Sequence, residues 1–293
     1  MKASAFAYAR ATSVANALEL LAVHGENAKV LSGGQSLIPA MNLRLVSPAL
    51  LVDISDIREL RGIAVRDETL VIGALTRHAD LLRSSDIAKC APLLAAAVAH
   101  VAHPAIRNRG TIGGSLAQAD PASELPACVL ALGATIVVRG PRGERRIAAA
   151  DFFTGIYETK LAPQDLLLAV EIPVGRKGSA HFFQEFARRH GDYAIVGLAA
   201  QAVLERGTFA DLRLGYFAVG DRPVLANVAA KLTGAAVTPA VLAAASAELS
   251  DELDPHEDQQ ATSTMRRHLA KVLLRRCVAT LLNRPDLHTG GDT

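Results

Sequence analysis

The chain has 293 residues, half of them hydrophobic, and 31 basic against 29 acidic residues give it a formal net charge of +2. This near balance argues against a nucleic-acid surface or an acidic polymer as the main partner. The length is about twice that of a typical domain, so two or three compact units with apolar cores are expected.

Cysteine usage and hydropathy restrict the protein class further. Cys90, Cys128 and Cys277 lie far apart with no CxxC pair, which predicts reduced, buried thiols rather than a self-contained iron–sulfur or zinc site. Residues 1–13 have too short an apolar core for a signal peptide. No run reaches the ~18 apolar residues that a membrane span needs, so the sequence predicts a soluble, cytoplasmic protein.

The first third of the chain mixes helix and strand. Residues 12–25 predict a helix capped by Thr12 or Ser13 and ended by Gly25. Residues 28–34 predict a short strand that ends in a glycine pair, and residues 50–55 a second strand. Residues 63–76 predict a hairpin that turns at Asp67 and Glu68.

The middle of the chain predicts buried helices and one unusual connection. Residues 78–85 and 87–102 are expected to form two helices, the second almost wholly apolar. Residues 103–127 are rich in Gly, Pro and Asn and too long for a simple connector. A helix at 124–133 and a strand at 134–140 follow.

The character of the sequence changes after Pro173. Residues 175–179 predict a linker, and long strands are expected at 180–189, 194–205 and 210–220, with helices at the end, notably 263–282. The pattern indicates an α+β fold throughout. We expect a first unit at 1–175, with subdomains of about 1–57 and 58–175, and a second unit at 176–293.

Two Gly-Gly pairs stand between small polar residues: a first glycine segment (residues 32–36, SGGQS) and a second glycine segment (residues 111–115, TIGGS). Glycine has no Cβ, so its peptide N–H can approach an anion, and successive N–H groups form a nest for phosphate oxygens. Hydroxyl donors in both segments would add to such a nest. Together the segments predict a cofactor with a diphosphate.

A simpler interpretation of each glycine pair is a tight turn, because glycine supplies positive φ at little cost. Neither segment matches GxGxxG or GxxxxGK[ST], so Rossmann and P-loop sites have no motif behind them. The matching polar flanks favour the phosphate nest, but the turn remains an alternative.

Other candidate residues also have two interpretations. Asp120 and Glu124 suit either acid–base chemistry or the first turn of a helix, and the helix role is favoured for Asp120. From spacing alone, Tyr193 is expected to be a tyrosine that packs in the protein or lies at the rim of a site. His100 and His103 lack a third metal ligand, so a cap or surface role is favoured.

Several ordered motifs resemble one known family. They are "GGQSLIPAMNLRL", "IRNRGTIGGSLAQADPASELPA", "FFTGIY", "LLLAVEIP" and "RRHGDYAIVGLAA". In this order they are similar to the FAD-binding medium subunits of molybdenum hydroxylases, which include carbon monoxide dehydrogenase medium chains and the FAD-binding part of xanthine dehydrogenase. The resemblance covers essentially the whole chain.

The resemblance implies a fold and a noncovalent FAD. The expected fold is a two-subdomain FAD-binding unit of the PCMH type, similar to vanillyl-alcohol oxidase, plus a C-terminal domain with a three-stranded antiparallel sheet and a helical bundle. The diphosphate is expected between the two glycine segments. The cofactor-binding residues implied are Lys29, Val30, Leu31, Ser32, Gly33, Gly34, Gln35, Ser36, Leu37, Thr111, Ile112, Gly113, Gly114, Ser115, Asp120, Glu124, Leu166, Leu167 and Tyr193.

Some of these residues have implied roles of their own. Glu124 stands where the family has an acid near the adenosine side, and Leu166 and Leu167 match apolar residues near the flavin and adenine. Tyr193 matches an aromatic residue that covers one flavin face. Gln35 departs from the His of the best-known carbon monoxide dehydrogenases, which weakens carbon monoxide as the substrate.

The resemblance implies a subunit that relays electrons and contains no catalytic residue or metal site of its own. Molybdopterin is expected on a large partner subunit and [2Fe–2S] clusters on a small one, in a dimer of heterotrimers. FAD would pass the electrons to NAD or a quinone. Two alternatives remain: a freestanding FAD-dependent oxidase or reductase of the same fold, and a non-enzymatic assembly or binding protein.

Overall fold

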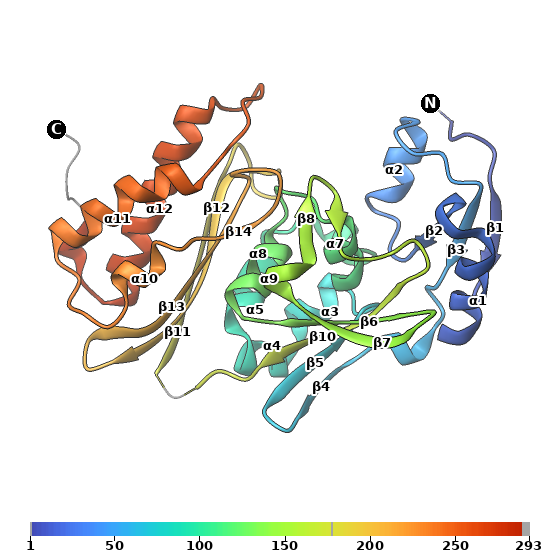
Figure 1. Cartoon of the computed structure of the whole chain (residues 1–293), viewed down its shortest axis with the longest axis horizontal. Coiled ribbons are helices and arrows are strands. Elements are labelled where there is room, and N and C mark those ends of the chain that lie inside the picture. Colours follow the sequence, from blue (N-terminus) through green and yellow to red (C-terminus); the bar gives the residue numbers. More distant parts are fainter. Residues whose placement is uncertain (1, 177, 289–293) are drawn as a thin grey trace.

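The computed structural model describes residues 2–176 and 178–288, and Figure 1 shows three lobes in chain order, built from helices and sheets together. The helices are α1 (Val14–His24), α2 (Leu37–Asn42), α3 (His78–Arg83), α4 (Ser85–Cys90), α5 (Pro92–Val98), α6 (Pro104–Arg107), α7 (Ile112–Gln118), α8 (Glu124–Ala131), α9 (Ala149–Phe152), α10 (Ala229–Leu232), α11 (Pro239–Glu252) and α12 (Ser263–Leu281). The strands are β1 (Ala7–Arg10), β2 (Ala28–Leu31), β3 (Leu50–Asp53), β4 (Ile63–Arg66), β5 (Thr69–Gly73), β6 (Thr135–Gly140), β7 (Gly143–Ala148), β8 (Phe153–Gly155), β9 (Glu158–Thr159), β10 (Leu166–Pro173), β11 (Ser179–Ala187), β12 (Ala194–Glu205), β13 (Thr208–Phe217) and β14 (Val224–Leu225).

The first lobe is a small parallel sheet in the order β1-β3-β2. Its helix α1 begins at the predicted cap, where the Ser13 hydroxyl accepts the N–H of Asn16, and ends at Gly25, whose φ is 51°. β2 therefore runs parallel to β3 and delivers the first glycine segment at its carboxyl end. The predicted helix and both predicted strands are confirmed.

The second lobe is a five-stranded antiparallel sheet in the order β4-β5-β10-β6-β7. The predicted β4–β5 hairpin is confirmed, and Asp67 and Glu68 both have positive φ in its turn. Positive φ at both central residues matches the right-handed twist of the flanking strands. Helices α3 to α8 belong to the same stretch of chain and lie beside this sheet in Figure 1.

Two helix predictions in this lobe were wrong. The single helix expected at 87–102 is two helices, α4 and α5, because Pro92 has no N–H to continue a helix and instead starts α5. The stretch at 103–127, expected to be irregular, contains α6 and α7. Pro104 begins α6, and the Thr111 side chain caps α7.

The third lobe is an antiparallel sheet in the order β11-β12-β13-β14, packed against α10, α11 and α12. Its three long strands and its helices agree with the predicted three-stranded sheet and helical bundle. The two-residue β14 is an addition at the sheet edge, paired with Gly215 and Tyr216. In Figure 1, α11 and α12 cover the outer face of this sheet.

Helix α8 joins the second and third lobes. All of its residues are buried, and it packs against α5 on one side and against β12 and β13 on the other. One hydrophobic core therefore contains residues of both lobes, for example Leu125 of α8 and Phe217 of β13. Among residues 2–176 and 178–288, no helix combines the length and the hydropathy that crossing a membrane requires.

Candidate functional site

The first glycine segment offers a row of unused peptide donors. It connects β2 to α2, and Gly34 has a φ of 73°, a conformation that favours glycine. The Gln35 side-chain amide donates to the Gly33 carbonyl at 2.9 Å and fixes the segment from within. In the part of the chain that the structure describes, no protein acceptor receives the N–H of any residue from 32 to 36. Such adjacent free donors suit an anion.

The second glycine segment differs, because its amides are used by the protein itself. It forms the cap and first turn of α7 rather than a loop. The N–H of Ile112 bonds to the Thr76 carbonyl, and that of Gly113 to the Ala74 carbonyl at 2.9 Å. The N–H of Gly114 bonds to the Thr111 hydroxyl at 3.1 Å, and that of Ser115 to the Thr111 carbonyl. The prediction that the second segment also forms a nest of free amides was therefore wrong.

The two segments nevertheless meet, as the sequence predicted. The hydroxyl oxygens of Ser32 and Thr111 lie 2.7 Å apart and share a hydrogen bond. A side chain at Gly33 would collide with the backbone carbonyl of Arg109, and a Cβ at Gly113 would lie 2.7 Å from Ala74. These glycines let two separate parts of the backbone touch. The crossing places the free amides of the first segment directly beside α7.

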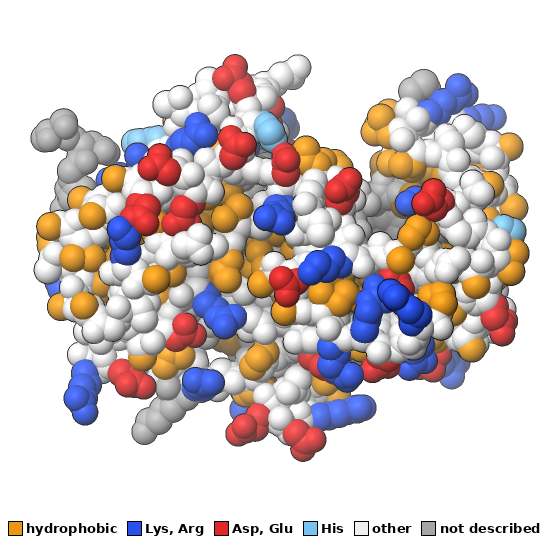
Figure 2. All heavy atoms as spheres, in the orientation of Figure 1, with side chains coloured by type: hydrophobic (Ala, Val, Ile, Leu, Met, Phe, Trp, Pro, Cys, Tyr) orange, Lys and Arg blue, Asp and Glu red, His pale blue; other side chains and the backbone are white. Residues whose placement is uncertain are grey.

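The neighbours of the first segment differ in accessibility. Lys29 on β2 is exposed, Val30 and Leu31 are half-buried, and Leu37 begins α2. Figure 2 shows the surface hollowed between the lobe that carries α2 and the lobe that carries α7 and β8. Both glycine segments flank these elements, so the free amides belong to the boundary between the two lobes.

Three apolar site candidates are core residues. The side chain of Ile112 is completely buried, and Leu166 and Leu167 are 3% and 5% exposed. Leu166 packs in the core of the first lobe and Leu167 in that of the second. β10 therefore contributes to both cores, and little surface of these residues remains for contact with a ligand.

An acidic and aromatic cluster lies at the start of α8. Burial raises the pKa of Asp120, although its carboxylate accepts the N–H of Ala122 at 2.9 Å. This bond closes a turn ahead of α8, whose N-cap is Ser123, so the helix role favoured for Asp120 was wrong. Burial also raises the pKa of Glu124 to about 7. Partial burial, followed by the charges of Asp120 and Glu124, raises the pKa of Tyr193, although 61% of this residue remains exposed. The fold thus brings Asp120, Glu124 and Tyr193 together.

Sequence analysis missed Tyr157 as a member of this cluster. Tyr157 lies in the turn between β8 and β9, is 55% exposed, and has a φ of 55°, which is rare for a large side chain. Partial burial, then the charges of Asp120 and Tyr193, raises the pKa of Tyr157. The available signal was an aromatic residue after Gly-Ile in a turn. Two exposed tyrosines therefore stand beside Asp120.

Sequence analysis also missed His78, which supports the second glycine segment. Its Nε2 lies 3.0 Å from the Ser115 hydroxyl, and its backbone N–H bonds to the Gly110 carbonyl. Burial lowers the pKa of His78 to about 4, so the ring is neutral at pH 7. An unpaired buried charge is thereby avoided next to the crossing of the two segments.

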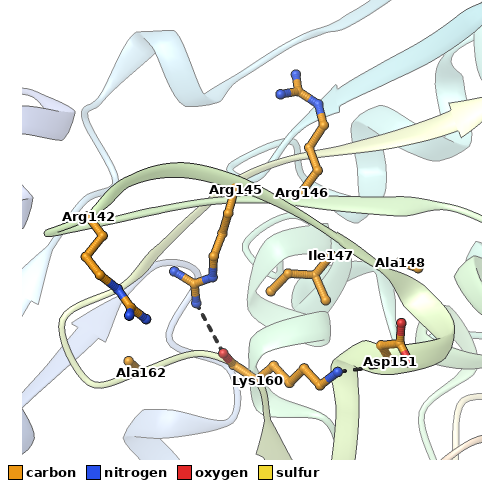
Figure 3. A pocket seen from close by; sticks show the side chains of 8 residues that line it. All are labelled: Arg142, Arg145, Arg146, Ile147, Ala148, Asp151, Lys160 and Ala162. Atoms are coloured by element: carbon orange, nitrogen blue, oxygen red, sulfur yellow. Dashed lines mark hydrogen bonds and ion pairs between the residues drawn. The ribbon is translucent and has the colours of Figure 1, made fainter.

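A separate basic hollow lies on β7. Figure 3 shows Arg142 and Arg145 directed toward Lys160, while Arg146 points away from it. Arg145 forms an ion pair with Asp165, Arg146 pairs with Glu171, and Lys160 approaches Asp151 at 4.0 Å. Most of the positive charge is compensated within the protein, which indicates a structural role for the hollow.

Metal-ligand chemistry has little support in the described residues. No group of three or more His, Cys, Asp or Glu side chains in residues 2–176 and 178–288 is arranged to hold a metal ion. Cys90, Cys128 and Cys277 are buried free thiols, as predicted. His100 bonds to Glu185 at 3.2 Å instead of pairing with His103 on a metal.

Comparison with known proteins gives matches along nearly the whole chain. The family described as FAD binding domain in molybdopterin dehydrogenase matches residues 4–175, and the family described as CO dehydrogenase flavoprotein C-terminal domain matches residues 181–281. The chain is 40% identical to subunit alpha of the 6-hydroxypseudooxynicotine dehydrogenase complex of Paenarthrobacter nicotinovorans, over 97% of both chains. It is 37% identical to the carbon monoxide dehydrogenase medium chain of Afipia carboxidovorans, over 93% of this chain and 95% of that one.

Solved structures agree with these sequence matches. A chain of the carbon monoxide dehydrogenase from Hydrogenophaga pseudoflava, in a form that lacks the Mo-pyranopterin moiety of the molybdenum cofactor, superposes with a TM-score of 0.94 at 35% identity. The superposition covers 97% of this chain and 99% of that one. The fold and the order of its parts are therefore those of these dehydrogenase chains.

Proposed function

The chain belongs to the FAD-binding medium subunits of the molybdenum hydroxylase family, and we propose that it passes electrons from iron–sulfur clusters on a partner subunit through FAD to an external acceptor. FAD supplies the redox chemistry, and the protein supplies binding, orientation and exclusion of water. The external acceptor is a small molecule such as NAD or a quinone.

One observation supports the diphosphate site most strongly. The peptide N–H groups of the first glycine segment have no acceptor in the described part of the chain, although five such groups follow one another. Hydrogen-bond donors that remain unused in a folded protein usually serve a ligand or water. A diphosphate provides several acceptor oxygens and two negative charges, which fits this row of donors.

The remaining candidate residues have proposed roles around this anchor. Lys29 and Leu31 line the cofactor through their backbone, and the hydroxyls of Ser32 and Ser36 add donors. Thr111 and Gly114 act mainly by holding α7 against the first segment, since the Thr111 hydroxyl bonds to Ser32 and the Gly114 amide is occupied. Tyr193 covers one flavin face. Neither glycine segment contains His or Cys, so we assign a noncovalent FAD.

The partners follow from what this chain contains. Its three cysteines are buried and separated, so we assign the [2Fe–2S] clusters to a small subunit and molybdopterin to a large subunit. The proposed assembly is a dimer of heterotrimers in the cytoplasm. The proposed division of this chain is an FAD-binding domain at 1–175, with subdomains of about 1–57 and 58–175, and a C-terminal domain at 176–293.

Two experiments test the proposal. The purified full chain is expected to show the visible absorption band of bound flavin, and an affinity-tagged chain is expected to copurify with molybdenum- and iron–sulfur-containing subunits. A chain that never acquires the flavin band would be a binding or assembly protein. A chain with flavin and its own oxidase activity, but without partners, would be a freestanding enzyme.

A further inference from the structure

A buried histidine of α3 reaches a hydroxyl group in the first turn of α7. The Nε2 of His78 lies 3.0 Å from the Oγ of Ser115, and His78 is only 4% exposed. The backbone N–H of His78 bonds to the Gly110 carbonyl, so the main chain holds the ring beside the second glycine segment. The other ring nitrogen, Nδ1, is buried and has no hydrogen-bond partner in the described structure.

These surroundings decide which ring nitrogen carries the proton. The ring is neutral at pH 7, so one nitrogen is an N–H donor and the other an acceptor. A proton on Nδ1 would be a buried donor without an acceptor, on a side of the ring where a Cβ at Gly110 would lie 3.0 Å away. Buried N–H groups without a partner are rare and costly, more so than unpaired acceptors. The proton therefore lies on Nε2, which donates to the Ser115 oxygen.

This bond leaves the hydroxyl proton of Ser115 without a use inside the protein. A serine in a helix commonly donates to the carbonyl four residues earlier, as Ser246 of α11 does to the Leu242 carbonyl at 2.7 Å. Ser115 stands four residues after Thr111, but among the described residues the only hydrogen bond of its hydroxyl is the one with His78. The Ser115 proton is therefore available to an acceptor outside its own helix.

The Ser115 hydroxyl belongs to the side of α7 that meets the first glycine segment. Ile112 and Leu116 are completely buried. Gly114 and Ser115 are half-buried and form the accessible side of the first turn. A Cβ at Gly114 would lie 3.9 Å from the Ser32 hydroxyl oxygen, so this side of the turn faces the unused amides of the first segment.

A second hydroxyl proton is left over where the two segments cross. The hydroxyl oxygens of Ser32 and Thr111 share one hydrogen bond, and the Thr111 oxygen also accepts the N–H of Gly114. Two hydroxyl groups supply two protons, and the bond between them uses one. In the part of the chain that the structure describes, neither hydroxyl has a further partner. With Ser115, two hydroxyl protons beside the free amides thus lack a protein acceptor.

We propose that His78 is a positioning residue of the diphosphate site: by donating to the Ser115 oxygen, it directs the Ser115 hydroxyl proton toward a phosphate oxygen. The second glycine segment thereby contributes hydroxyl donors to the cofactor, although its amides are occupied. The inference rests on the proposed FAD site and adds to it the residue that orients this hydroxyl from the buried side.

Removal of the Ser115 hydroxyl measures its contribution to FAD binding. Hydrogen bonds to charged groups are the stronger ones, so the Kd for FAD should rise about tenfold in Ser115→Ala. Ser246→Ala removes a helical hydroxyl in the third lobe and is the matched control, with an unchanged Kd. Titration of the full chain with FAD, followed by flavin fluorescence, gives these values. Equal Kd values for wild type and Ser115→Ala would overturn the inference.

Variants of His78 separate orientation of the hydroxyl from support of the fold. In His78→Asn the amide is too short to reach the Ser115 oxygen, so the Ser115 proton can turn to the Thr111 carbonyl, and the Kd should rise about tenfold. In His78→Gln the amide nitrogen takes the place of Nε2 and should restore most of that affinity. The double variant His78→Asn, Ser115→Ala should bind FAD as Ser115→Ala does, because both changes remove the same contact. Additive losses would show that His78 only supports the fold and would overturn the inference.

A spectroscopic measurement tests the position of the proton without FAD. Nitrogen-15 NMR of the FAD-free full chain at about pH 7 distinguishes protonated from unprotonated imidazole nitrogens, and the His78 signals are those that His78→Gln lacks. A proton on Nε2 is expected, and a proton on Nδ1 would overturn the inference. Absence of FAD binding by the wild-type chain would instead refute the proposed cofactor site, while the nitrogen spectrum still decides where the proton lies.

Discussion

The two glycine segments are similar in sequence and opposite in hydrogen bonding. In residues 32–36 the peptide N–H groups have no protein acceptor among the described residues, while in residues 111–115 the four N–H groups after Thr111 all have one. The first segment holds Gly34 at positive φ, and the second packs Gly113 against Ala74. The same dipeptide thus provides ligand donors in one place and close backbone packing in the other.

A negative charge at the first glycine segment should have the largest effect, a loss of affinity for FAD. Asp and Asn both tolerate positive φ, so Gly34→Asp and Gly34→Asn differ mainly in one negative charge. A carboxylate about 4 Å from a phosphate costs about 4 kcal/mol at a protein surface, so the Kd for FAD should rise about a thousandfold in Gly34→Asp relative to Gly34→Asn. Flavin fluorescence titration gives both values, and equal affinities would remove the diphosphate from this segment.

At the second segment, the free energy of unfolding should instead depend on pH through His78. Its pKa is about 4 in the folded protein and about 6.5 in the unfolded chain, so the unfolded chain binds more protons between these values. The contribution of His78 to unfolding free energy should therefore rise by about 3 kcal/mol from pH 4 to pH 6.5. The difference between wild type and His78→Gln, from urea unfolding at each pH, measures it. A difference that is flat with pH would contradict a neutral, buried ring.

Packing at the second segment should have a smaller effect. A Cβ at Gly113 would lie 2.7 Å from both the Cβ and the carbonyl oxygen of Ala74, so Gly113→Ala should destabilise the protein by about 2 kcal/mol. Gly207→Ala is a suitable comparison, because its φ is 79° but no atom lies within 4 Å, and it should cost about 1 kcal/mol. Denaturant unfolding measures both, and a larger loss at Gly207 would argue against the close contact.

The link between the segments should have the smallest effect. Ser32→Ala and Thr111→Val each remove one partner of the 2.7 Å hydrogen bond, and Thr111→Val also removes the cap of α7. In a double-mutant cycle the two hydroxyls should show a coupling of about 1 kcal/mol in unfolding free energy. Additive single-variant effects would show that the crossing does not depend on this bond.

The sequence predicted elements with clear local signals. Ser13 and Gly25 delimit α1, and the turn at Asp67 and Glu68 closes the β4–β5 hairpin. The predictions failed where a residue's hydrogen-bond partner lies far away in the sequence. The amides of Ile112 and Gly113 looked free because their acceptors, Thr76 and Ala74, are about 40 residues earlier in the chain.

The candidate site shows the same division. Its glycine pairs and Tyr193 were visible as motifs, and the ordered motifs identified the family. His78 was not visible, because it acts through Ser115, a side chain that folding brings from another element. Leu166 and Leu167 were assigned to the cofactor, yet their burial follows from the position of β10 between two cores. No periodicity in a single segment contains that information.

Hydrogen exchange of individual amides tests the contrast between the segments most directly. In the FAD-free full chain, the N–H groups of residues 33–36 should exchange rapidly, while those of Ile112, Gly113, Gly114 and Ser115 should be protected. Addition of FAD should protect residues 33–36 and leave the second segment unchanged. Rapid exchange at residues 33–36 in the FAD-bound chain, or new protection confined to the second segment, would contradict the assignment of the diphosphate to the first glycine segment.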